Sequence, residues 1–423
     1  MRSPILGAIA DDFTGAVELA GVLAAGGART LLFTGPQAVP PQLADTDAVV
    51  IALRSRVAPP DEAIATVQAA ADAFEALGVQ QIFFKYCATF DSTDSGNIGN
   101  CSEVLLARTG APSALFCPGF PEAFRTIYQG HLFVADRLLQ DSPKRFDPLT
   151  PMTRSRLSDV LAPQTTLAVG LLPWEVVQAG AAAIRSHVAG LAAAGTPFVI
   201  ADTLTDGDLQ AIAQASWDWR FTTGGSTVVG HYPAIWQEQG LIPRLVPPSP
   251  PRVAGAGAVL AGSCSDRTRE QIAAFGQHHP VLELDVLANE AATVSHALDW
   301  ATPRLADGPV CITTSTSADA VAAAQARMGA VAAGRFAEGL LGQIATGLVA
   351  RGVRRLLVAG GETSGSIVQA LGITELHVAP YTTAGLGVCL VEAPVRLALC
   401  LKSGKLGTVD MFARTLAEMG DAA

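Results

Sequence analysis

The sequence predicts an α/β fold, with two α/β domains that carry mostly parallel sheets and an active-site cleft between the domains. Short apolar runs alternate with longer segments rich in alanine and leucine, which is the pattern of strands that cross to helices in a parallel sheet. The chain has 423 residues, more than one hydrophobic core normally serves. Open α/β sheets bind ligands beyond the carboxyl ends of their strands, so we expect the site at those ends.

The alternation can be followed element by element through the first half of the chain. Apolar runs predict strands at Ile5–Ala10, Thr30–Phe33, Ala48–Ala52, Gln81–Lys85, Ala114–Cys117, Thr166–Val169 and Phe198–Ala201. Between them, helices are predicted at Gly15–Ala25, Asp61–Leu77, Cys101–Arg108 and near Trp174–Ala193.

The stretch "LVPPSPPRVAGAGA", Leu245 to Ala258, is the predicted domain boundary. Proline lacks the backbone donor that a helix or central strand needs, and consecutive prolines stay extended. We expect an N-terminal domain over 1–244, a linker over 245–257 and a C-terminal domain over 258–423. The alternation then resumes with the predicted elements Ala258–Ala261, Asp266–Phe275, Val281–Leu284, Val310–Thr313, Arg335–Ala350 and Arg355–Ala359.

Composition limits the classes of partner. Hydrophobic residues make up 49% of the chain and charged residues 16%, as in a well-buried globular protein. A net charge of −10 disfavours nucleic acid, although a local pocket can still hold a small anion. The seven cysteines show no metal-binding spacing. The N-terminus does not resemble a signal peptide and no apolar run is long enough to cross a membrane. These features predict a soluble, cytoplasmic protein without membrane partners; its oligomeric state is open, with a homodimer among the candidates.

The first polar cluster follows the first predicted strand, in "ILGAIADDFTGAVELA". Asp11 and Asp12 come directly after the strand, and Thr14 opens the next helix. Asp12 or Thr14 alone could be a helix N-cap. Two adjacent carboxylates can also bind sugar hydroxyls, and one can take a proton from an alcohol.

The second cluster is "FFKYCATFDSTDSGNIGN". Lys85 ends an apolar strand and is followed by a loop that contains Asp91 and Ser92. A lysine at a strand end is often simply solvated, but beside such a loop it can hold an anion. Asn97 and Gly99 can equally serve a turn.

The third cluster is "CPGFPEAFRTIYQGHLFV". Arg125 can bind a carboxylate through two parallel hydrogen bonds, while Gln129 and His131 can contact hydroxyls. A lone histidine is more often structural. Together the three clusters suit a small, anionic and hydroxylated ligand.

The second domain has glycine- and serine-rich turns after its predicted strands. Ser263 and Ser265 flank Cys264 where a helix begins, although Ser265 can simply be the N-cap. "VAGGETSGSIVQAL" repeats that arrangement, and "CLKSGKLG" places Lys402, Ser403 and Gly404 after another apolar strand. Glu362 suits a phosphate turn if it holds Mg²⁺, directly or through water, or contacts a ribose hydroxyl. Such turns indicate a nucleotide site, and a nucleotide facing an acid sugar implies phosphoryl transfer.

In combination, these motifs resemble the four-carbon acid sugar kinase family, and within it the 3-oxo-tetronate kinase branch. The matching stretches run in order from about Leu6 to Phe412: "ADDFTGA", "KYCATFDST", "GNIG", "CPGFPE", "RTIYQGHLFV", "PLTPMT", "GSCS", "GVRRLLVAGGETSGSIVQALGI" and "LKSGKLG". The resemblance implies an ATP-dependent kinase that phosphorylates the terminal (4-) hydroxyl of a four-carbon acid sugar. In that family the N-terminal domain binds the sugar and the C-terminal domain binds ATP.

The resemblance places the ATP contacts on Ser263, Gly361, Glu362, Thr363, Ser364 and Gly404. On the sugar side we assign catalysis to Asp12, Asp11 and Lys85, and substrate binding to Asp91, Ser92, Arg125, Gln129 and His131. Asp12 is the favoured base, with Lys85 or Arg125 on the substrate carboxylate. We expect ATP and Mg²⁺ as cofactors and no metal site made by protein ligands alone.

The chain departs from the family pattern at Ala88, Thr222–Pro233, Ala379–Leu390 and Lys405. These positions lie in loops expected to face ligands, so a non-catalytic or substrate-divergent acid-sugar and nucleotide-binding protein is the alternative. A metal-dependent phosphatase would need further His or Asp ligands. A nicotinamide dehydrogenase would need a complete GxGxxG after a strand.

Overall fold

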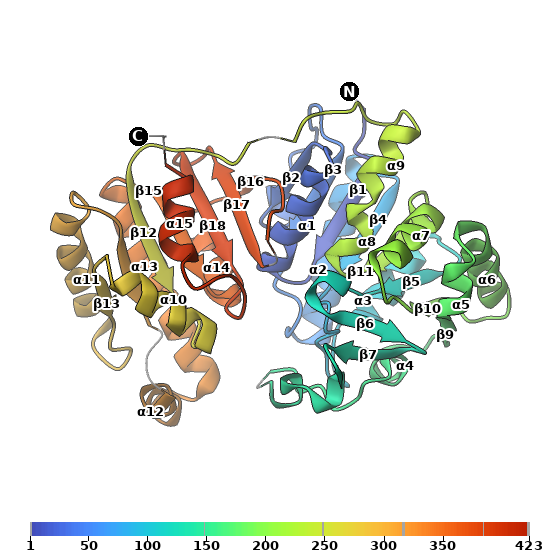
Figure 1. Ribbon diagram of the computed structural model, residues 1–423, viewed down its shortest axis with the longest axis horizontal. Helices are drawn as coiled ribbons and strands as arrows, with labels where there is room; N and C mark the ends of the chain where they lie inside the picture. The colour runs from blue at the N-terminus through green and yellow to red at the C-terminus, as the bar shows by residue number, and fades with distance from the viewer. Residues whose placement is uncertain (1, 148, 248, 315–317, 384, 421–423) are drawn as a thin grey trace. The chain divides into compact units, whose positions relative to one another are not determined.

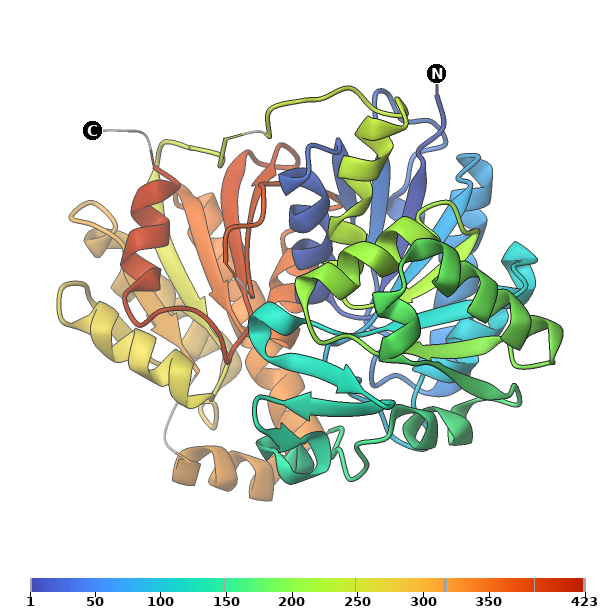
Figure 2. The same cartoon turned by 45° about the vertical axis from the view of Figure 1, so that its right-hand side comes forward.

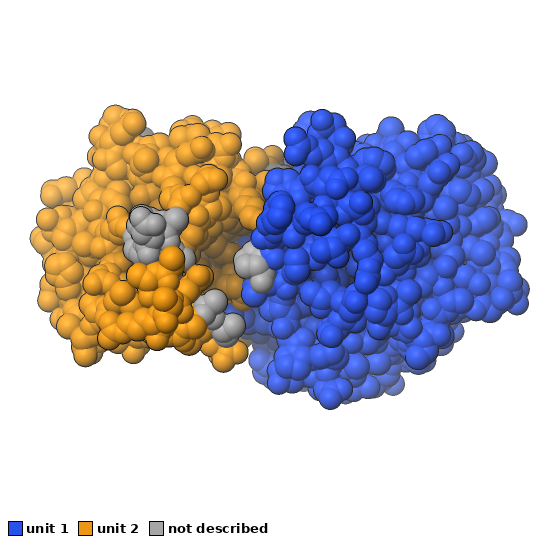
Figure 3. Space-filling view, turned by 90° about the horizontal axis from the view of Figure 1, so that it is seen from below, with its two compact units in different colours: residues 1–247 blue, residues 248–423 orange. Residues whose placement is uncertain are grey.

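The computed structural model describes residues 2–147, 149–247, 249–314, 318–383 and 385–420. The chain forms two compact units, residues 1–247 and 248–423, which Figure 3 shows in two colours. Residues 243–247 and 249–254, within the proline-rich stretch, form neither helix nor strand. No helix in the described part of the chain combines the length and apolar character needed to span a membrane.

The first unit is built on a parallel sheet with the strand order β2-β3-β1-β4-β11-β5-β10-β9. The first strand of the chain, β1, pairs with β3 on one side and β4 on the other, so that Leu6 lies opposite both Ala48 and Gln81. The strands are β1 (Leu6–Ala10), β2 (Thr30–Phe33), β3 (Ala48–Ala52), β4 (Gln81–Lys85), β5 (Ala114–Cys117), β9 (Val169–Leu172), β10 (Phe198–Ala201) and β11 (Phe221–Gly224).

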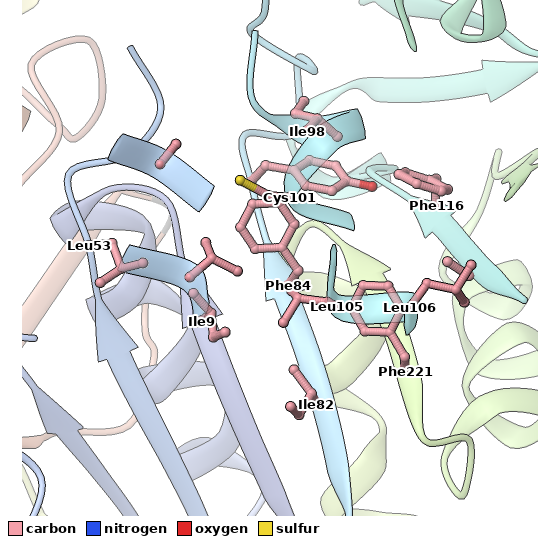
Figure 4. Packing of buried hydrophobic residues seen from close by; sticks show 14 of the residues in the cluster. Ile9, Leu53, Ile82, Phe84, Ile98, Cys101, Leu105, Leu106, Phe116 and Phe221 are labelled. Carbon is pink, nitrogen blue, oxygen red and sulfur yellow. The ribbon is translucent and has the colours of Figure 1, made fainter. Parts of the chain in front are cut away.

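Helices cover both faces of this sheet (Figures 1 and 2). One face carries α1 (Phe13–Ala25), α5 (Trp174–Gln178), α6 (Ala181–Ala193), α7 (Asp206–Ser216), α8 (Ser226–Gly230) and α9 (Tyr232–Glu238). The other carries α2 (Pro60–Ala76), α3 (Ile98–Thr109) and α4 (Leu157–Leu161). Apolar side chains of α3 such as Cys101 and Leu105 pack against Phe84 of β4 in the core (Figure 4). Residues buried on both sides of the sheet explain why its strands read as continuous apolar runs.

A small antiparallel sheet follows β5 and was not predicted. It contains β6 (Arg125–Tyr128), β7 (His131–Val134) and β8 (Arg137–Leu138). Two isolated bridges join β6 to the large sheet's loops: Arg125 pairs with Phe120, just after β5, and Ile127 pairs with Thr203, just after β10. Because alternation over four residues is too short to stand out from loop sequence, these strands carry no clear periodic signal.

The second unit has the strand order β13-β14-β12-β15-β18-β17-β16. Its strands are β12 (Ala256–Ala261), β13 (Val281–Glu283), β14 (Val310–Thr313), β15 (Val353–Ala359), β16 (Glu375–Val378), β17 (Leu386–Val391) and β18 (Leu397–Lys402). All neighbours are parallel except β17, which is antiparallel to both β18 and β16.

This sheet too lies between helices (Figure 1). One face carries α10 (Asp266–Gly276) and α15 (Met411–Glu418), and the other α11 (Glu290–Arg304), α13 (Ala330–Ala350) and α14 (Gly361–Ala370). The helix α12 (Ala318–Met328) packs against α13. The prediction of two α/β domains with mostly parallel sheets is therefore confirmed. Among the predicted elements, the strand expected at Thr166–Val169 spans Val169–Leu172 instead. The helix expected near Trp174–Ala193 is two helices, because Gly180 adopts φ +86° between them.

Each sheet has one point where the connections from two adjacent strands leave in opposite directions. In the first unit β1 leads toward β2 on one side and β4 leads toward β5 on the other. In the second unit β12 leads toward β13 and β15 leads toward β16. We call such a place a switch point. Because the loops separate beyond the two strands, ligands are expected to bind at these two switch points.

Candidate functional site

Asp11 and Asp12 follow β1 at the switch point of the first unit, and both bind the same arginine. Arg56 Nε and Nη2 donate to Asp11 Oδ2 and Oδ1 at 2.9 and 2.8 Å, and Nη2 also lies 2.9 Å from Asp12 Oδ1. The loop that carries Arg56 is fixed in turn, since the N–H groups of Ser55 and Arg56 donate to the carbonyl of Asp11. One guanidinium therefore holds the two carboxylates side by side.

The two carboxylates differ in exposure and in acidity. Asp11 is almost fully buried, whereas about a fifth of the Asp12 side chain is exposed (21%). Burial raises the pKa of Asp11 although Arg56 opposes it. Burial would also raise the pKa of Asp12, but Arg56, Lys85, the Thr14 hydroxyl and the Gly15 N–H together bring it below its usual value. Asp12 is thus the more acidic and the more accessible member of the pair.

Asp12 also caps helix α1, as the structural alternative anticipated. Its Oδ1 accepts from Gly15 N at 3.0 Å and its Oδ2 accepts from Thr14 Oγ1 at 2.9 Å. Gly15 is needed here, because a Cβ at this position would overlap Asp12 Oδ1 and lie 3.1 Å from Lys85 Nζ. Capping and a site role coexist in this residue, since the cap fixes the direction of the carboxylate.

Lys85 ends β4, directly beside the end of β1, where Ala10 is its register partner. The residue is buried. Its ammonium donates to the carbonyl of Tyr86 at 3.1 Å, and this is the only hydrogen bond that the ammonium makes to the described residues. An ammonium has three donors. The structure therefore leaves Lys85 with donors for an anionic ligand at the switch point.

Asp91 belongs to a second charged network in the loop after β4. Its Oδ1 accepts from Thr89 Oγ1 at 2.7 Å, and its Oδ2 pairs with Lys144 Nζ at 2.5 Å. Lys144, on the short 3₁₀ segment Pro143–Phe146, also lies 3.3 Å from Asp147. The charge of Asp91 is thus already balanced by a protein cation.

Buried oxygen atoms with no hydrogen-bond partner among the described residues lie in the same loops. Ser55 Oγ and Asn97 Oδ1 are of this kind, while the Asn97 amide donates to the carbonyls of Ser55 and Ala58. Ser92 is buried and its hydroxyl accepts from Gln164 Nε2 at 2.9 Å. Buried polar atoms normally have partners, so unsatisfied ones beside Asp11 and Arg56 suit a hydroxylated ligand.

The structure places Gln129 and His131 away from the Asp11–Asp12 pair. Gln129 lies at the turn after β6, where its N–H donates to Asp202 at the end of β10. β10 is four strands from β1, which corresponds to ~19 Å at ~4.8 Å per strand. His131 Nδ1 bonds the carbonyl of Gln129 and stays with that turn. Arg125 starts β6 near the end of β5, closer to β4.

In the second unit, Ser263 and Gly404 meet at the switch point. Ser263 follows β12 and Gly404 follows β18, and a Cβ on Gly404 would overlap Ser263 Oγ. Ser265 caps α10 by accepting from Thr268 N and also donates to the carbonyl of Gly404 at 2.6 Å. The N-cap alternative for Ser265 is therefore what the structure has, and the same hydroxyl ties the two turns together.

The turn after β15 meets the same point. Gly360 adopts φ +136°, and a Cβ there would lie 2.8 Å from Thr363 Oγ1 and 3.3 Å from Ser263 N. Helix α14 begins at Gly361, with Glu362 exposed in its first turn. Ser364 is fully buried and its hydroxyl donates to the carbonyl of Gly360 at 2.7 Å, so it fixes the turn from behind. Backbone N–H groups at the starts of α10 and α14 are the expected anion donors.

No group of three or more His, Cys, Asp or Glu side chains in the described ranges is arranged to hold a metal ion. Mg²⁺ in nucleotide sites is typically bound by one or two carboxylates together with phosphate oxygens. Glu362 is the carboxylate at the Gly361 turn and fits that use.

Comparisons with known proteins match each of the two units to a described type of domain. A model described as a sugar-binding N-terminal domain matches residues 6–232, and one described as a nucleotide-binding C-terminal domain matches residues 258–412. A 3-oxo-tetronate kinase of Pseudomonas fluorescens is 44% identical over 420 residues, 98% of this chain and 97% of that one. The chain belongs to the four-carbon acid sugar kinase family, in its 3-oxo-tetronate kinase branch. A 3-oxo-tetronate kinase of Cupriavidus necator is 43% identical over 99% of this chain and 98% of its own length.

Solved structures support the same fold for this member of the kinase family. A protein of Salmonella typhimurium LT2 has a TM-score of 0.86 at 33% identity, covering 97% of this chain and 98% of its own. A protein of Haemophilus influenzae has a TM-score of 0.78 at 32% identity, covering 98% of this chain and 100% of its own.

The sequence analysis missed two cations, Arg56 and Lys144. Arg56 stands four residues beyond the predicted strand Ala48–Ala52, in "ALRSRV", so the rule that selected the other strand ends could have found it. Lys144 lies on no strand end, and only its tertiary contact with Asp91 brings it to the site.

We predict that Arg56→Met lowers the free energy of unfolding at neutral pH by ~3 kcal/mol, since it leaves the buried carboxylate of Asp11 and the partly exposed carboxylate of Asp12 without their shared cation. Loss of Arg56 raises the folded-state pKa of both aspartates, so the variant should regain stability as the pH falls from about 7 to about 5. Denaturant unfolding at both pH values measures this.

The matched control is Arg108→Met, which removes ion pairs to the exposed carboxylates of Asp72 and Glu75. Exposed pairs contribute about 0–1 kcal/mol, so this variant should change little. Equal destabilisation in the two variants would contradict the bridging role of Arg56.

Proposed function

We propose that the protein is an ATP-dependent kinase that phosphorylates the terminal (4-) hydroxyl of a four-carbon acid sugar of the 3-oxo-tetronate type. Curated relatives that carry the name 3-oxo-tetronate kinase, 36–44% identical over nearly their whole length, support this assignment. The observation that carries it is the kind of group that gathers at each of the two switch points. One unit gathers carboxylates and cations there, and the other gathers glycine turns at helix starts.

On the sugar side, we assign Asp12 to the reacting hydroxyl and Lys85 to the substrate carboxylate. In the proposed step the C4 oxygen forms a bond to the γ-phosphorus of ATP, and the bond between that phosphorus and the β,γ-bridging oxygen breaks. The hydroxyl proton goes to the Asp12 carboxylate. Because the pKa of Asp12 is below its usual value, it is ionised at neutral pH and accepts this proton late, when the alcohol oxygen already bonds phosphorus.

Asp11 and Arg56 support Asp12 from within the protein. Asp11 is nearly buried and both its oxygens bind Arg56, so it acts through the arginine and does not need to touch the sugar. Ser55 Oγ and Asn97 Oδ1 are the nearby groups that hydroxyls of the substrate or a bound water would satisfy. We assign Arg125, Gln129 and His131, which belong to the β6–β7 hairpin, a secondary role in substrate binding.

On the nucleotide side, we assign the phosphates to the turns at Ser263, Gly361–Thr363 and Gly404. Ser364 contributes by holding Gly360. Mg²⁺, bound by the phosphates with Glu362 directly or through water, would neutralise charge on the transferring group. We further propose that residues 1–244 bind the sugar and 258–423 the nucleotide, joined by the linker 245–257.

The proposed activity is tested by ADP release from ATP and Mg²⁺ in the presence of a panel of four-carbon acids. We expect release with 3-oxo-tetronate and less with 2-oxo or fully reduced acids of the same length. Binding of both ATP and the acid without release of ADP would overturn the kinase assignment in favour of a binding protein.

For Asp12→Asn we predict turnover reduced by about 10²- to 10⁴-fold, the usual contribution of a positioned base, with nucleotide affinity unchanged. Steady-state kinetics and calorimetric titration with ADP measure the two quantities. Asp94→Asn is the control, because Asp94 is exposed and pairs only with Arg154 among the described residues; its turnover should stay close to that of the wild type. A large loss of ADP affinity in Asp12→Asn would mean that the residue is wrongly assigned.

For Gly404→Val we predict weaker nucleotide binding, since the new side chain displaces Ser263. Overpacking of this kind costs ~1–3 kcal/mol. Because the strain falls on the turn that binds the nucleotide, we expect ADP affinity to fall about ten- to a hundredfold. Gly339→Ala, on the exposed side of α13 with open space around it, should bind ADP normally. Unchanged ADP affinity in Gly404→Val would remove this turn from the nucleotide site.

A further inference from the structure

Lys402 is the last residue of β18 and is fully buried. Its ammonium donates to the carbonyl of Gly404 at 2.9 Å and to Thr268 Oγ1 at 3.2 Å. No carboxylate of the described residues pairs with it: its recorded partners are these two neutral oxygens. A buried charge normally has a partner of opposite sign, so this lysine needs a reason to be there.

The residues around Lys402 supply no negative charge within ion-pair distance in the described part of the chain, and one of them, Arg267, is a second cation. Its register partners are apolar, Ala359 on β15 and Leu386 on β17. On α10 it faces Thr268 and the charged Arg267, and α14, which packs on β18, carries the exposed Glu362 in its first turn. Burial lowers the pKa of Lys402 to about 8, and Arg267 acts in the same direction.

The neighbouring thiol does not compensate the charge. Burial raises the pKa of Cys400 well above its usual value, so Cys400 is neutral over the range in which Lys402 titrates. At neutral pH the ammonium is therefore mostly protonated and opposed by no fixed negative charge within ion-pair distance in the described part of the chain.

Lys402 also forms the back of the nucleotide turns. The Gly404 carbonyl accepts three hydrogen bonds, from Lys402 Nζ, Ser265 Oγ and Thr268 Oγ1. Ser263 Oγ donates to Ser265 Oγ at 3.2 Å and so joins the same network. With its carbonyl fixed on the protein side, the Gly404 turn is held in one orientation.

We propose that Lys402 is a positioning residue of the nucleotide site, where it fixes the Gly404 turn and supplies a buried positive charge that the phosphates of the bound nucleotide balance. The inference deepens the proposed function and rests on the nucleotide role of these turns. It explains why a lysine is buried among neutral partners: the missing negative charge arrives with the ligand.

A consequence that distinguishes this role from a structural one is proton uptake. The polyanion favours the ammonium form, so nucleotide binding raises the pKa of Lys402 above its free value of about 8. Between the free and bound pKa values, binding takes one proton from the buffer. Nucleotide affinity therefore falls as the pH rises through this range, by about tenfold for each unit of the binding-induced shift.

The test is calorimetric titration of the full-length protein with ADP at about pH 8.5, in two buffers of different ionisation enthalpy. The nucleotide phosphate is already fully ionised there, because its last pKa is ≈ 6. Because about three quarters of a lysine with a pKa of about 8 is neutral at this pH, we expect the wild type to take up more than half a proton, and at most about three quarters of one, for each ADP bound. Lys402→Arg, which remains charged at this pH, should bind ADP without proton uptake, and Lys402→Met should bind it about tenfold or more weakly, also without uptake.

Lys405→Met is the matched control. Lys405 is an exposed lysine on the same loop, so its removal should leave the proton uptake unchanged. Other groups that titrate near pH 8, such as the terminal amine, are unchanged in the Lys402 variants, so loss of the proton uptake in those variants assigns it to Lys402.

Wild-type binding of ADP without proton uptake, and with an affinity that does not vary between about pH 7 and about pH 9.5, would overturn the role of Lys402 while leaving the kinase assignment in place. Absence of any ADP binding by the wild type would overturn both. Since these measurements need only the wild-type protein, the inference stays testable if a variant at this position does not fold.

Discussion

Adjacent parallel strands whose connections leave in opposite directions are the constraint on which both candidate sites depend. At the β1/β4 and β12/β15 pairs the loops cannot cover the strand ends, so polar groups can gather there with backbone N–H groups still available to a ligand. The apolar core beneath makes this possible, because strands buried on both faces keep their ends in register.

The two switch points handle charge in different ways. At β1/β4 the protein balances its own charges: Arg56 serves two aspartates and Lys144 serves Asp91. At β12/β15 the groups are neutral hydroxyls, helix starts, the exposed carboxylate of Glu362 and one buried lysine without a carboxylate partner in the described residues. A carboxylated sugar is only weakly anionic and needs orientation, whereas a nucleotide brings several negative charges that must be compensated. The difference in charge balance between the two switch points therefore matches the different charges of the two proposed ligands.

Much of this could be predicted from the sequence, because parallel strands at the centre of a doubly covered sheet read as unbroken apolar runs and the polar groups that follow them stand out. Asp11, Asp12, Lys85, Ser263, Gly361 and Gly404 are selected in this way, and the structure places each at or just after a strand end, while their roles stay predictions. What could not be predicted depends on tertiary distance. Gln129 and His131 are close to Arg125 in sequence, yet the hairpin carries them to the end of β10. Lys144 approaches Asp91 from a 3₁₀ segment with no periodic signal, and the partners of Lys402 are visible only once α10 and β18 are side by side.

The cysteines differ in a way that has a practical meaning. Six are buried or half-buried, and burial raises the pKa of each of Cys87, Cys101, Cys117, Cys311, Cys389 and Cys400. Cys264 is exposed, and it lies between Ser263 and Ser265 at the start of α10. Thiol-directed dyes therefore reach one sulfur ahead of the others, and that sulfur stands at the glycine turns themselves. The chain carries a built-in attachment point for a fluorophore that could report occupancy of the turns without any engineered residue.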